Sequence, residues 1–539
     1  MAFLERRIFP CVNQVDVMYS VETESTSQSA DQSHLTLVSS ALLDGPNGQR
    51  AAGSNKPVPG VVSRAEEFAA TILKRLGFGP CPGDTAAFIA LGSSDAERLA
   101  VFLELQLQPE WIREDDLHVR LQESGLKVEE KSPSADPELP VQNRLQAIQQ
   151  ADRIAILRAL YSRRQVLERL TGFWHRQFRV DATDPWIAPS WTDLNEKVIR
   201  ANAMGNYRRL LMQLATSVPL LLHYVNPTAC DPAAYNNFVG ILFNGDEPTA
   251  LAPLGTESDV LEAARCFTGW TVDYLTEQFH YSAECHDRDS KQVFGQTIPG
   301  DQAPMQDGCR VLDLIAHHPE TAQRVAWMLC REFVADDPPP SVVSTAAAIF
   351  LEQRFAADQL KQVIQAIVLS PEFNDSKGLR HRRPFEMAIG SLRALGTDLH
   401  LPFNDSSANW LVATLIQTSD FPVYHHTPDH LEPIAPLTVE RIHRGMRVAH
   451  QRWQGRFRFF NVIAETPANL TRADEIGDYW IARILGKTLD AAKRDQFLEK
   501  LSDPHWSNAS LQLEVDPAVQ DRLQSLVMDL LLSKDNKHC

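Results

Sequence analysis

The feature that most constrains the fold is a helical spacing of apolar residues that recurs along most of the chain. Apolar side chains recur three and four positions apart from Val141 to Phe178 and again from Leu194 to Tyr224. This spacing gathers them on one side of an α-helix, so each segment must bury that side against other helices. Pro219 interrupts the second segment and predicts a kink or break there. The pattern predicts a mainly α protein.

Shorter segments with the same spacing follow. The expected helices are Asp259–Thr268, Thr321–Phe333, Ser341–Arg354, Leu360–Leu369, Pro384–Leu395, Thr438–Arg452, Ala473–Leu485, Ala491–Leu501 and Pro517–Leu532. Strand signals are few, and only Gln278–Ala283 and Lys291–Ile298 have a composition that would let them pair as a hairpin. We therefore expect a large multi-helix fold with at most a small β-hairpin insert.

The composition of successive segments predicts three regions. Residues 1–62 contain a stretch rich in Ser, Gln, Asn, Gly and Pro, which predicts a flexible N-terminal tail. Order is expected from Ser63, a helix-capping residue followed by early acidic positions. Residues 63–452 predict a helical core with a proline-rich linker at 131–140. Residues 453–539 predict a C-terminal helical extension packed on the core.

Charge and composition narrow the class of partner and the compartment. The 52 basic and 69 acidic residues give a net charge of -17, which argues against nucleic acid as a partner. No stretch reaches the roughly 20 apolar residues of a membrane span. The N-terminus lacks the apolar region of a secretory signal. The 8 cysteines form no CxxC pair, which favours reduced thiols and a cytoplasmic location.

Several longer motifs occur in a characteristic order. They are RLGFGPCPGD, FWHRQF, AMGNYRRLL, DVLEAARCFTGWT, HDRDSKQVFG, HHPETAQRVAWMLCREFVADDPP, SPEF and RPFEMAIGSLRALG. In this order they resemble the bacterial DUF1800 family, whose members are long, mostly helical proteins without an established general activity. The resemblance spans Ala70 to Arg452, and the motifs after Asp259 are specific as a set.

The chain departs from the family pattern at several polar positions. Family members usually have a histidine where this chain has Gln177, two residues after His175, and often one at the position of Thr71. The segment AAYNNFVGILFNG lacks the usual Arg-Glu pair, and HHTPDHLEP replaces the usual Thr-Pro-Asp-Gly-Tyr-Pro. The resemblance thus implies either a different chemistry or a lost activity.

Candidate site residues gather in the stretch from Asp259 to Pro340. His286 and Asp287 precede Lys291 by five and four positions, so a carboxylate beside an imidazole would orient a base or hold a metal. The alternative is an Asx-type turn in which Lys291 neutralises Asp287. His317 and His318 precede Pro319 and a strong helix, where His318 is expected to cap the helix start.

Two further groups of histidines lie outside that stretch. His175 ends a long amphipathic helix and is either a hydrogen-bonded core histidine or a ligand or base. His425, His426, Asp429 and His430 form the densest potential ligand cluster, with side chains suited to zinc or iron. Thr427-Pro428 weakens this interpretation, because it predicts an extended turn that also suits a polar loop.

These residues support two functional hypotheses of different classes. The first is a metal-dependent enzyme, with iron, copper or zinc, that oxidises a small organic or peptide-derived substrate. Its catalytic groups would be His286, Asp287, Lys291 and His175, and its metal ligands His175, His286, Asp429 and His430. The second is a non-catalytic helical scaffold that binds a protein partner. A metal-assisted hydrolase is a third possibility. The HExxH, Walker, GxGxxG and GxSxG motifs are absent.

Overall fold

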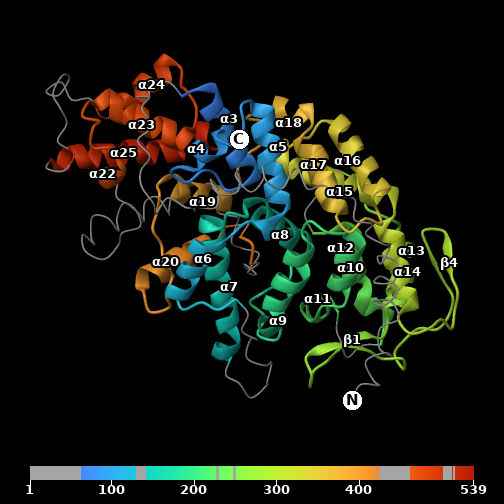
Figure 1. The fold of residues 1–539 in the computed structure, drawn as a ribbon. Coiled ribbons are helices and arrows are strands. Elements are labelled where there is room, and N and C mark those ends of the chain that lie inside the picture. The colour runs from blue at the N-terminus through green and yellow to red at the C-terminus, as the bar shows by residue number, and fades with distance from the viewer. Residues whose placement is uncertain are drawn as a thin grey trace.

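The computed structural model describes residues 62–128, 141–225, 230–246, 251–418, 421–423, 462–499, 501, 513 and 516–539. Helices dominate these residues, and the two small sheets lie at one end of the molecule (Figure 1). The predicted mainly α fold is confirmed. Almost all of the proposed tail, the linker at 131–140 and the expected helix Thr438–Arg452 lie outside the described residues.

The first half of the fold comprises α3 (Arg64–Leu76), α4 (Asp84–Ile89), α5 (Asp95–Leu107), η1 (Pro109–Trp111), α6 (Asp115–Glu123), α7 (Val141–Tyr161), α8 (Gln165–Phe178), α9 (Ala188–Asp193), η2 (Leu194–Arg200), α10 (Tyr207–Ala215), α11 (Val218–Tyr224), η3 (Pro232–Tyr235), α12 (Asn236–Asn244) and α13 (Glu257–Phe267). The second half comprises α14 (Gln306–Ala316), α15 (Pro319–Phe333), α16 (Pro340–Glu352), α17 (Gln359–Val368), α18 (Pro371–Asp375), α19 (Pro384–Ala394), α20 (Ser406–Leu415), α22 (Val462–Glu465), α23 (Ala473–Leu485), α24 (Ala491–Leu498), α25 (Pro517–Leu532) and η4 (Lys534–Asn536).

The long helix expected from Val141 to Phe178 is two helices, α7 and α8. The chain turns at Ser162, whose hydroxyl donates a hydrogen bond of 2.8 Å to the buried carboxylate of Glu114. The backbone N–H of Arg163 donates to the same carboxylate, and the Arg164 side chain donates to the Ile112 carbonyl. These contacts with the segment before α6 stabilise a turn that apolar spacing alone does not reveal.

The second long pattern divides further, into η2, α10 and α11. Asn206 caps α10, because its side chain accepts a hydrogen bond from the backbone N–H of Arg209. Pro219 lies in the first turn of α11, where its missing N–H costs no hydrogen bond. The predicted break is therefore present, just before Pro219.

Two hairpins replace the single hairpin expected from the sequence. β1 (Trp270–Asp273) pairs antiparallel with β2 (Gln278–Tyr281), with Trp270 opposite Tyr281. β3 (Lys291–Val293) pairs with β4 (Gln296–Ile298), with Lys291 opposite Ile298. The expected pairing of 278–283 with 291–298 is wrong, because the second segment folds back on itself. Phe294 and Gly295 both have positive φ, of 50° and 70°, as a tight two-residue hairpin turn requires.

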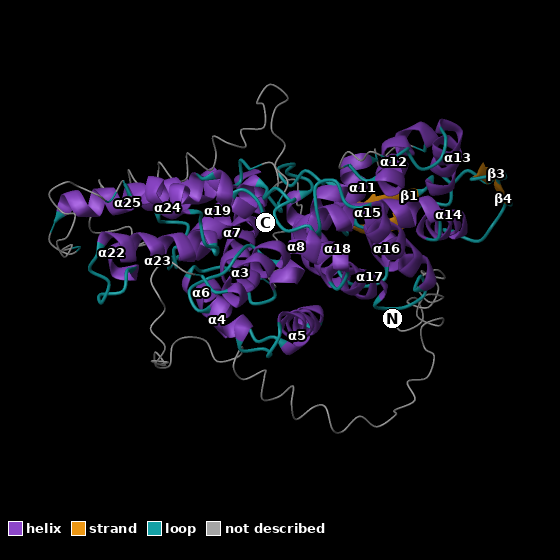
Figure 2. Cartoon of the chain, turned by 90° about the horizontal axis from the view of Figure 1, so that it is seen from above, coloured by secondary structure: helices purple, strands orange, loops and turns teal. Residues whose placement is uncertain are grey.

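One continuous hydrophobic core joins most of the helices, and four tryptophans, Trp174, Trp191, Trp270 and Trp480, are almost completely buried in it. The C-terminal helices α23, α24 and α25 lie together beyond α19, at the end of the molecule opposite the two sheets (Figure 2). No helix in the described residues is both long and apolar enough to cross a membrane.

Candidate functional site

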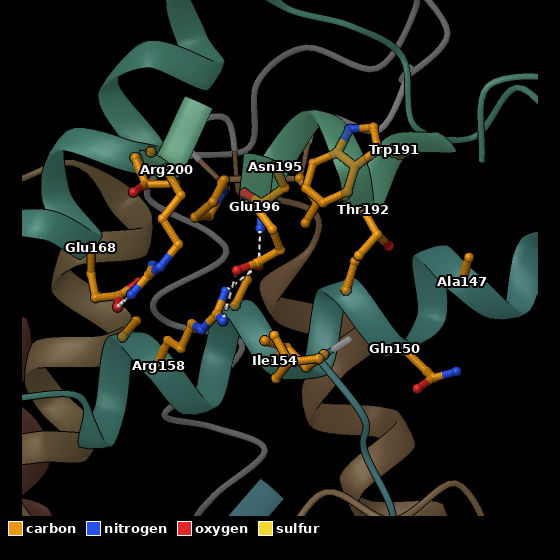
Figure 3. A pocket seen from close by; sticks show the side chains of 18 of the residues that line it. Ala147, Gln150, Ile154, Arg158, Glu168, Trp191, Thr192, Asn195, Glu196 and Arg200 are labelled. Carbon is orange, nitrogen blue, oxygen red and sulfur yellow. Dashed lines mark hydrogen bonds and ion pairs between the residues drawn. The ribbon is translucent and has the colours of Figure 1, made fainter. Parts of the chain in front are cut away.

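A cavity of about 280 Å³ lies between α7, α8, α9 and η2 (Figure 3). Its lining comes from segments far apart in the sequence. The lining residues are Phe78, Lys127, Val128, Gln146, Ala147, Gln150, Ala151, Ile154, Ala155, Arg158, Ala159, Glu168, Thr171, Gly172, Trp191, Thr192, Asn195, Glu196, Arg200, Pro422 and Val423. The volume is that of a site for a small organic molecule.

One wall of the cavity is an apolar face of α7. Ala147, Ala151, Ile154 and Ala155 recur at the three- and four-residue spacing of one helical face, and three of these four side chains are single methyl groups. Small side chains on a core-facing helix leave space that larger ones would fill. The indole of Trp191 lines the cavity from α9.

One part of the lining carries two ion pairs. Arg158 contacts both carboxylate oxygens of Glu196, at 2.5 and 3.1 Å, and Arg200 contacts both oxygens of Glu168, at 2.6 and 2.8 Å. Burial would raise the pKa of Glu168, but the charge and hydrogen bonds of Arg200 hold this pKa below its usual range. Both pairs are bidentate, the geometry that fixes an arginine and a carboxylate most firmly.

The polar groups are positioned by an unusual helical segment. Residues Leu194–Arg200 form a π-helix that continues directly from α9 and carries Asn195, Glu196 and Arg200 into the lining. π-Helical turns are rare, because their hydrogen bonds skip one residue more than those of an α-helix, and they are concentrated at functional sites. Apolar spacing alone does not distinguish this segment from an ordinary helix.

His175 lies beside this cavity and is not part of its lining. Its Nε2 is 2.8 Å from Asn195 Oδ1, and its ring stacks on Trp191 with centroids 4.9 Å apart. Asn195 in turn donates a hydrogen bond of 2.6 Å to Glu196. Burial lowers the pKa of His175 to about 4, so the imidazole is neutral at pH 7. In this arrangement His175 positions two lining residues.

A second, larger cavity adjoins the first. It has a volume of about 610 Å³ and is also lined by Arg158, Glu196 and Arg200. Glu114, His118 and Arg164 contribute further polar groups from the α6 side. The Arg158–Glu196 pair and Arg200 therefore line both cavities.

Three other predicted site residues, His286, Asp287 and Lys291, lie together in a separate cluster between α13, α14 and β3. Lys291 is fully buried, and its Nζ is 2.6 Å from Asp307 Oδ2. The Nε2 atom of His286 is 3.4 Å from the same oxygen, and its Nδ1 is 2.9 Å from the Thr268 carbonyl. Burial would raise the pKa of Asp307, but His286 and Lys291 together lower it.

Asp287 has a closer partner in addition to the Lys291 proposed for it. Its carboxylate contacts Arg265 at 2.7 and 3.2 Å, while its nearer oxygen is 3.8 Å from Lys291 Nζ. Lys291 also donates a hydrogen bond to the Asp287 backbone carbonyl. Burial would raise the pKa of Asp287, and the Arg265 contact lowers it. The sequence did not point to Asp307 or Arg265. Each lies on an amphipathic helix, where a charged side chain is expected to be exposed to solvent.

A disulfide anchors the loop that carries this cluster. Cys230 and Cys285 are bonded, with their Cα atoms 4.7 Å apart, and Cys285 directly precedes His286. The expectation of reduced thiols is therefore wrong for these two cysteines. Among the described residues, Cys81, Cys266, Cys330 and Cys539 are free thiols. Spacing in the sequence gave no sign of the pair, because 55 residues separate its members.

The structure thus brings His286, Asp287 and Lys291 together but places His175 in another cluster, beside the cavity. Asp429 and His430 lie outside the described residues, as do His425 and His426. In the described part of the chain, no group of three or more His, Cys, Asp or Glu side chains is arranged to hold a metal ion. The metal and catalytic roles assigned to these residues stay predictions.

The predicted role of His318 is confirmed. Its Nδ1 accepts a hydrogen bond of 3.2 Å from the backbone N–H of Glu320, which caps α15. His317 ends α14 and packs edge-on against Phe355. Neither ring lines the cavities described above.

The sequence profile of a protein family of unknown function, DUF1800, matches residues 71–237 and 254–533 of this chain. The chain belongs to the DUF1800 family. The family match continues past Arg452, so it includes most of the segment 453–539 that the sequence sets apart as an extension. No curated protein and no solved structure matches this DUF1800 chain.

Two of the positions where this DUF1800 protein departs from the family pattern are Gln177 on α8 and Thr71 on α3. Gln177 is buried on α8, and its backbone carbonyl accepts a hydrogen bond of 2.7 Å from the N–H of Asp246. The Thr71 hydroxyl donates 2.8 Å to the Glu67 carbonyl within α3. Both positions lie outside the lining of the 280 Å³ cavity.

Proposed function

We propose that this DUF1800 protein binds a small amphipathic organic molecule in the 280 Å³ cavity. The observation that carries the proposal is the joining of an apolar α7 wall to two bidentate Arg–Glu pairs in one concave site. Sites for small molecules combine a mostly apolar lining with a few fixed polar groups. The net charge of -17 fits such a ligand better than it fits a nucleic acid.

The polar part of the ligand is expected to be uncharged. Arg158 and Arg200 already hold carboxylates, so a charged head group would have to break a buried or half-buried ion pair, at a cost of several kcal/mol. The amide of Asn195 and the hydroxyl of Thr192 also line the cavity and belong to uncharged residues. A head group such as an amide, which donates and accepts, matches this lining.

A thermal-shift series tests the proposal with probes that share one apolar body. Phenylacetamide, phenylacetate and benzylamine share a benzyl group and carry a neutral amide, a negative carboxylate and a positive ammonium head, respectively. We expect phenylacetamide to raise Tm most, because a bound ligand stabilises the folded state. The Ala151→Trp variant fills the cavity and should weaken its binding at least tenfold.

Gln149→Trp is the matched control, since Gln149 is exposed on the same helix and does not line the cavity. It should bind the probe as the unmodified chain does. The proposal is wrong if none of the three probes raises Tm, or if the shift is unchanged in Ala151→Trp.

A metal-dependent oxidative enzyme is the second candidate function. The observation that favours it is that Pro422 and Val423 line the cavity just before the histidine-rich segment that begins at His425. Imidazole and carboxylate ligands suit iron, copper or zinc. A colourless zinc centre would instead favour metal-assisted hydrolysis.

Metal content and the visible spectrum of untagged protein test this candidate. We expect near-stoichiometric metal that is lost in the His425→Ala/His426→Ala double variant and kept in His280→Gln, whose histidine is exposed on β2. Metal-free, colourless protein after reconstitution with iron, copper and zinc would contradict the metalloenzyme hypothesis. The proposal of small-molecule binding in the 280 Å³ cavity would then remain.

We further propose that the protein works in an oxidising compartment rather than in the cytoplasm expected from its composition. The Cys230–Cys285 disulfide supports this proposal, because cytosolic reductants keep most protein thiols reduced. Trapping thiols with an alkylating agent in intact cells tests it. Alkylation of Cys230 and Cys285 in intact cells would show that both thiols are reduced and would favour a cytoplasmic location.

A further inference from the structure

A separate cavity of about 390 Å³ lies between α3, the end of α19 and α23. Its lining is mostly apolar, with a few charged side chains at one side. The lining residues are Val62, Glu66, Ala70, Lys74, Pro80, Cys81, Pro82, Gly83, Thr85, Ala394, Leu470, Glu475, Asp478, Tyr479, Ala482, Arg483 and Gly486. Glu66, Pro82 and Gly83 are exposed, so this rim is where the cavity meets solvent.

Lys74 is a buried amine in this lining. It stands in the last turn of α3, and only 6% of the residue is exposed. Its Nζ donates hydrogen bonds to two backbone carbonyls at the end of α23, those of Ile484 at 3.0 Å and Leu485 at 2.8 Å. In the described part of the chain, no carboxylate oxygen lies within 4.0 Å of Lys74 Nζ, the distance limit for an ion pair.

This hydrogen-bond arrangement is compatible with a neutral amine. A neutral –NH₂ group has two N–H donors, and the two carbonyls accept both of them, which leaves the nitrogen lone pair unused. An ammonium would bring a third donor and a full charge into a site without a carboxylate partner. A lysine of this kind is a nucleophile at neutral pH.

Burial and two of three neighbouring charges lower the pKa of Lys74. Burial is the largest cause that lowers the pKa of Lys74, to about 7, followed by the positive charge of Arg382; Cys539 opposes the shift and Lys487 adds to it. The acidic residues of the cavity, Glu66, Glu475 and Asp478, form no ion pair with Nζ within 4.0 Å. Asp478 is held by Arg494 at 2.7 Å.

We propose that Lys74 captures a small apolar aldehyde or ketone as an imine within the 390 Å³ cavity. The nitrogen lone pair attacks the carbonyl carbon, a C–N bond forms, and the carbonyl π electrons move to oxygen. A proton passes from nitrogen to that oxygen to give a carbinolamine. Solvent at the rim then protonates its hydroxyl, water leaves as the nitrogen lone pair forms the C=N bond, and the resulting iminium returns its N–H proton to solvent. The sum is amine plus carbonyl gives imine plus water, with no oxidant or reductant.

The lining selects the body of the ligand. Pro80, Pro82, Ala394 and Leu470 offer an apolar surface, so an unsubstituted aromatic or aliphatic carbonyl compound fits best. This site shares no lining residue with the 280 Å³ cavity, and the inference is therefore independent of the proposed function.

Reductive trapping tests the inference on the full chain. The protein is incubated at pH 7 with benzaldehyde and cyanoborohydride, and the alkylated lysines are found by peptide mapping. At this pH roughly half of an amine with pKa about 7 is neutral, against roughly one in several thousand for an ordinary lysine. We expect Lys74 to be labelled at least tenfold faster than Lys377 and Lys493, whose side chains are about half exposed.

A cavity-filling variant distinguishes labelling that depends on binding of the aldehyde in the cavity from labelling that depends only on a reactive amine. Ala482→Phe should slow the labelling of Lys74 by benzaldehyde at least tenfold while leaving labelling by formaldehyde within about twofold. Lys74→Met should lose the labelled peptide. Because the first comparison uses internal reference lysines of the unmodified chain, it stands even if Lys74→Met does not fold. Labelling of Lys74 no faster than that of Lys493 between pH 6 and 9 would overturn the inference.

Discussion

His175 shows how burial changes what a histidine can do in this protein. Its sequence context favours a hydrogen-bonded core residue and leaves a ligand or base as the alternative, because the same imidazole serves both roles. In the fold, Nε2 is engaged by Asn195 and the ring is stacked on Trp191. The ring is therefore held in place. It would affect the proposed ligand binding only by positioning Asn195 and Trp191, which line the cavity.

The buried His175 should make stability depend on pH. Its pKa is about 4 in the fold against an ordinary 6.5, so between these values the unfolded chain binds a proton that the folded chain does not. Stability should fall as pH drops from 6.5 towards 4, by up to roughly 3 kcal/mol from this group. Urea unfolding from pH 4 to 8 measures the effect.

His175→Gln should flatten this part of the pH profile, because glutamine does not titrate. His280→Gln is the control, since His280 is exposed, and it should leave the profile unchanged. An identical pH profile in the unmodified chain and in His175→Gln would contradict the prediction.

Glu332 illustrates a different effect, the balance of charge inside the core. Its carboxylate is 1% exposed and contacts Arg169 at 2.5 Å, Arg176 at 2.7 Å and Arg383 at 2.8 Å. Glu386 neutralises part of the remaining positive charge through Arg169 and Arg380. These side chains join α8, α15 and α19, which are far apart in the sequence.

Removing the Glu332 carboxylate should be strongly destabilising. Glu332→Ala leaves buried guanidinium groups without their partner, and a loss of about 3–5 kcal/mol is expected in the free energy of unfolding. Chemical denaturation followed by circular dichroism measures it. The surface pair Arg472–Asp474 is the comparison, and Asp474→Ala should change stability by less than about 1 kcal/mol. Equal effects of the two substitutions would refute this account.

At the scale of elements, the disulfide fixes the loop of the His286 cluster onto the segment that precedes η3. Cys230 stands just before η3, and Cys285 stands between β2 and β3. The loop closed by the bond spans α12, α13 and the first hairpin. Such a cross-link acts mainly by restricting the unfolded chain.

Breaking this disulfide should therefore lower stability without rearranging the fold. Cys285→Ser is expected to lower the free energy of unfolding by about 2–4 kcal/mol. Dithiothreitol should lower the Tm of the unmodified chain about as much as the Cys285→Ser substitution does. It should lower the Tm of Cys285→Ser by less. Cys330→Ser, at a buried free thiol, controls for loss of a sulfur atom. A Tm of the unmodified chain that does not respond to dithiothreitol would show that this bond does not contribute.

At the scale of the whole molecule, the two proposed ligand sites lie in different parts of the helical array. The 280 Å³ cavity is enclosed by α7, α8, α9 and η2, whereas the Lys74 cavity is enclosed by α3, α19 and α23. Distant sites without shared partners act independently in most proteins.

The two cavity-filling substitutions should consequently be additive. In the Ala151→Trp/Ala482→Phe double variant, the change in the free energy of unfolding should equal the sum of the single changes within about 0.5 kcal/mol. Each single variant should impair only its own ligand assay. A larger deviation, or loss of Lys74 labelling in Ala151→Trp, would indicate that the two cavities are coupled.

The local pattern of the sequence accounts for most of the helices. Ala473–Leu485 and Pro517–Leu532 have the predicted bounds, and the capping role of His318 was predicted correctly. These features depend on spacing and capping within one turn or two of helix, which neighbouring residues decide. The family was recognised for a related reason, since its motifs are contiguous in the sequence.

Tertiary structure decided the rest, because those features depend on residues far apart in the chain. The turn between α7 and α8 is held by Glu114, the disulfide joins Cys230 to Cys285, and the buried amine of Lys74 donates to carbonyls of α23. A helical pattern marks a charged residue on a polar face as exposed, yet packing against a distant helix buries it. The sequence determined by itself which segments are helices and which family the chain resembles; only the packing of those helices decided which side chains meet, where cavities remain and which groups change their protonation.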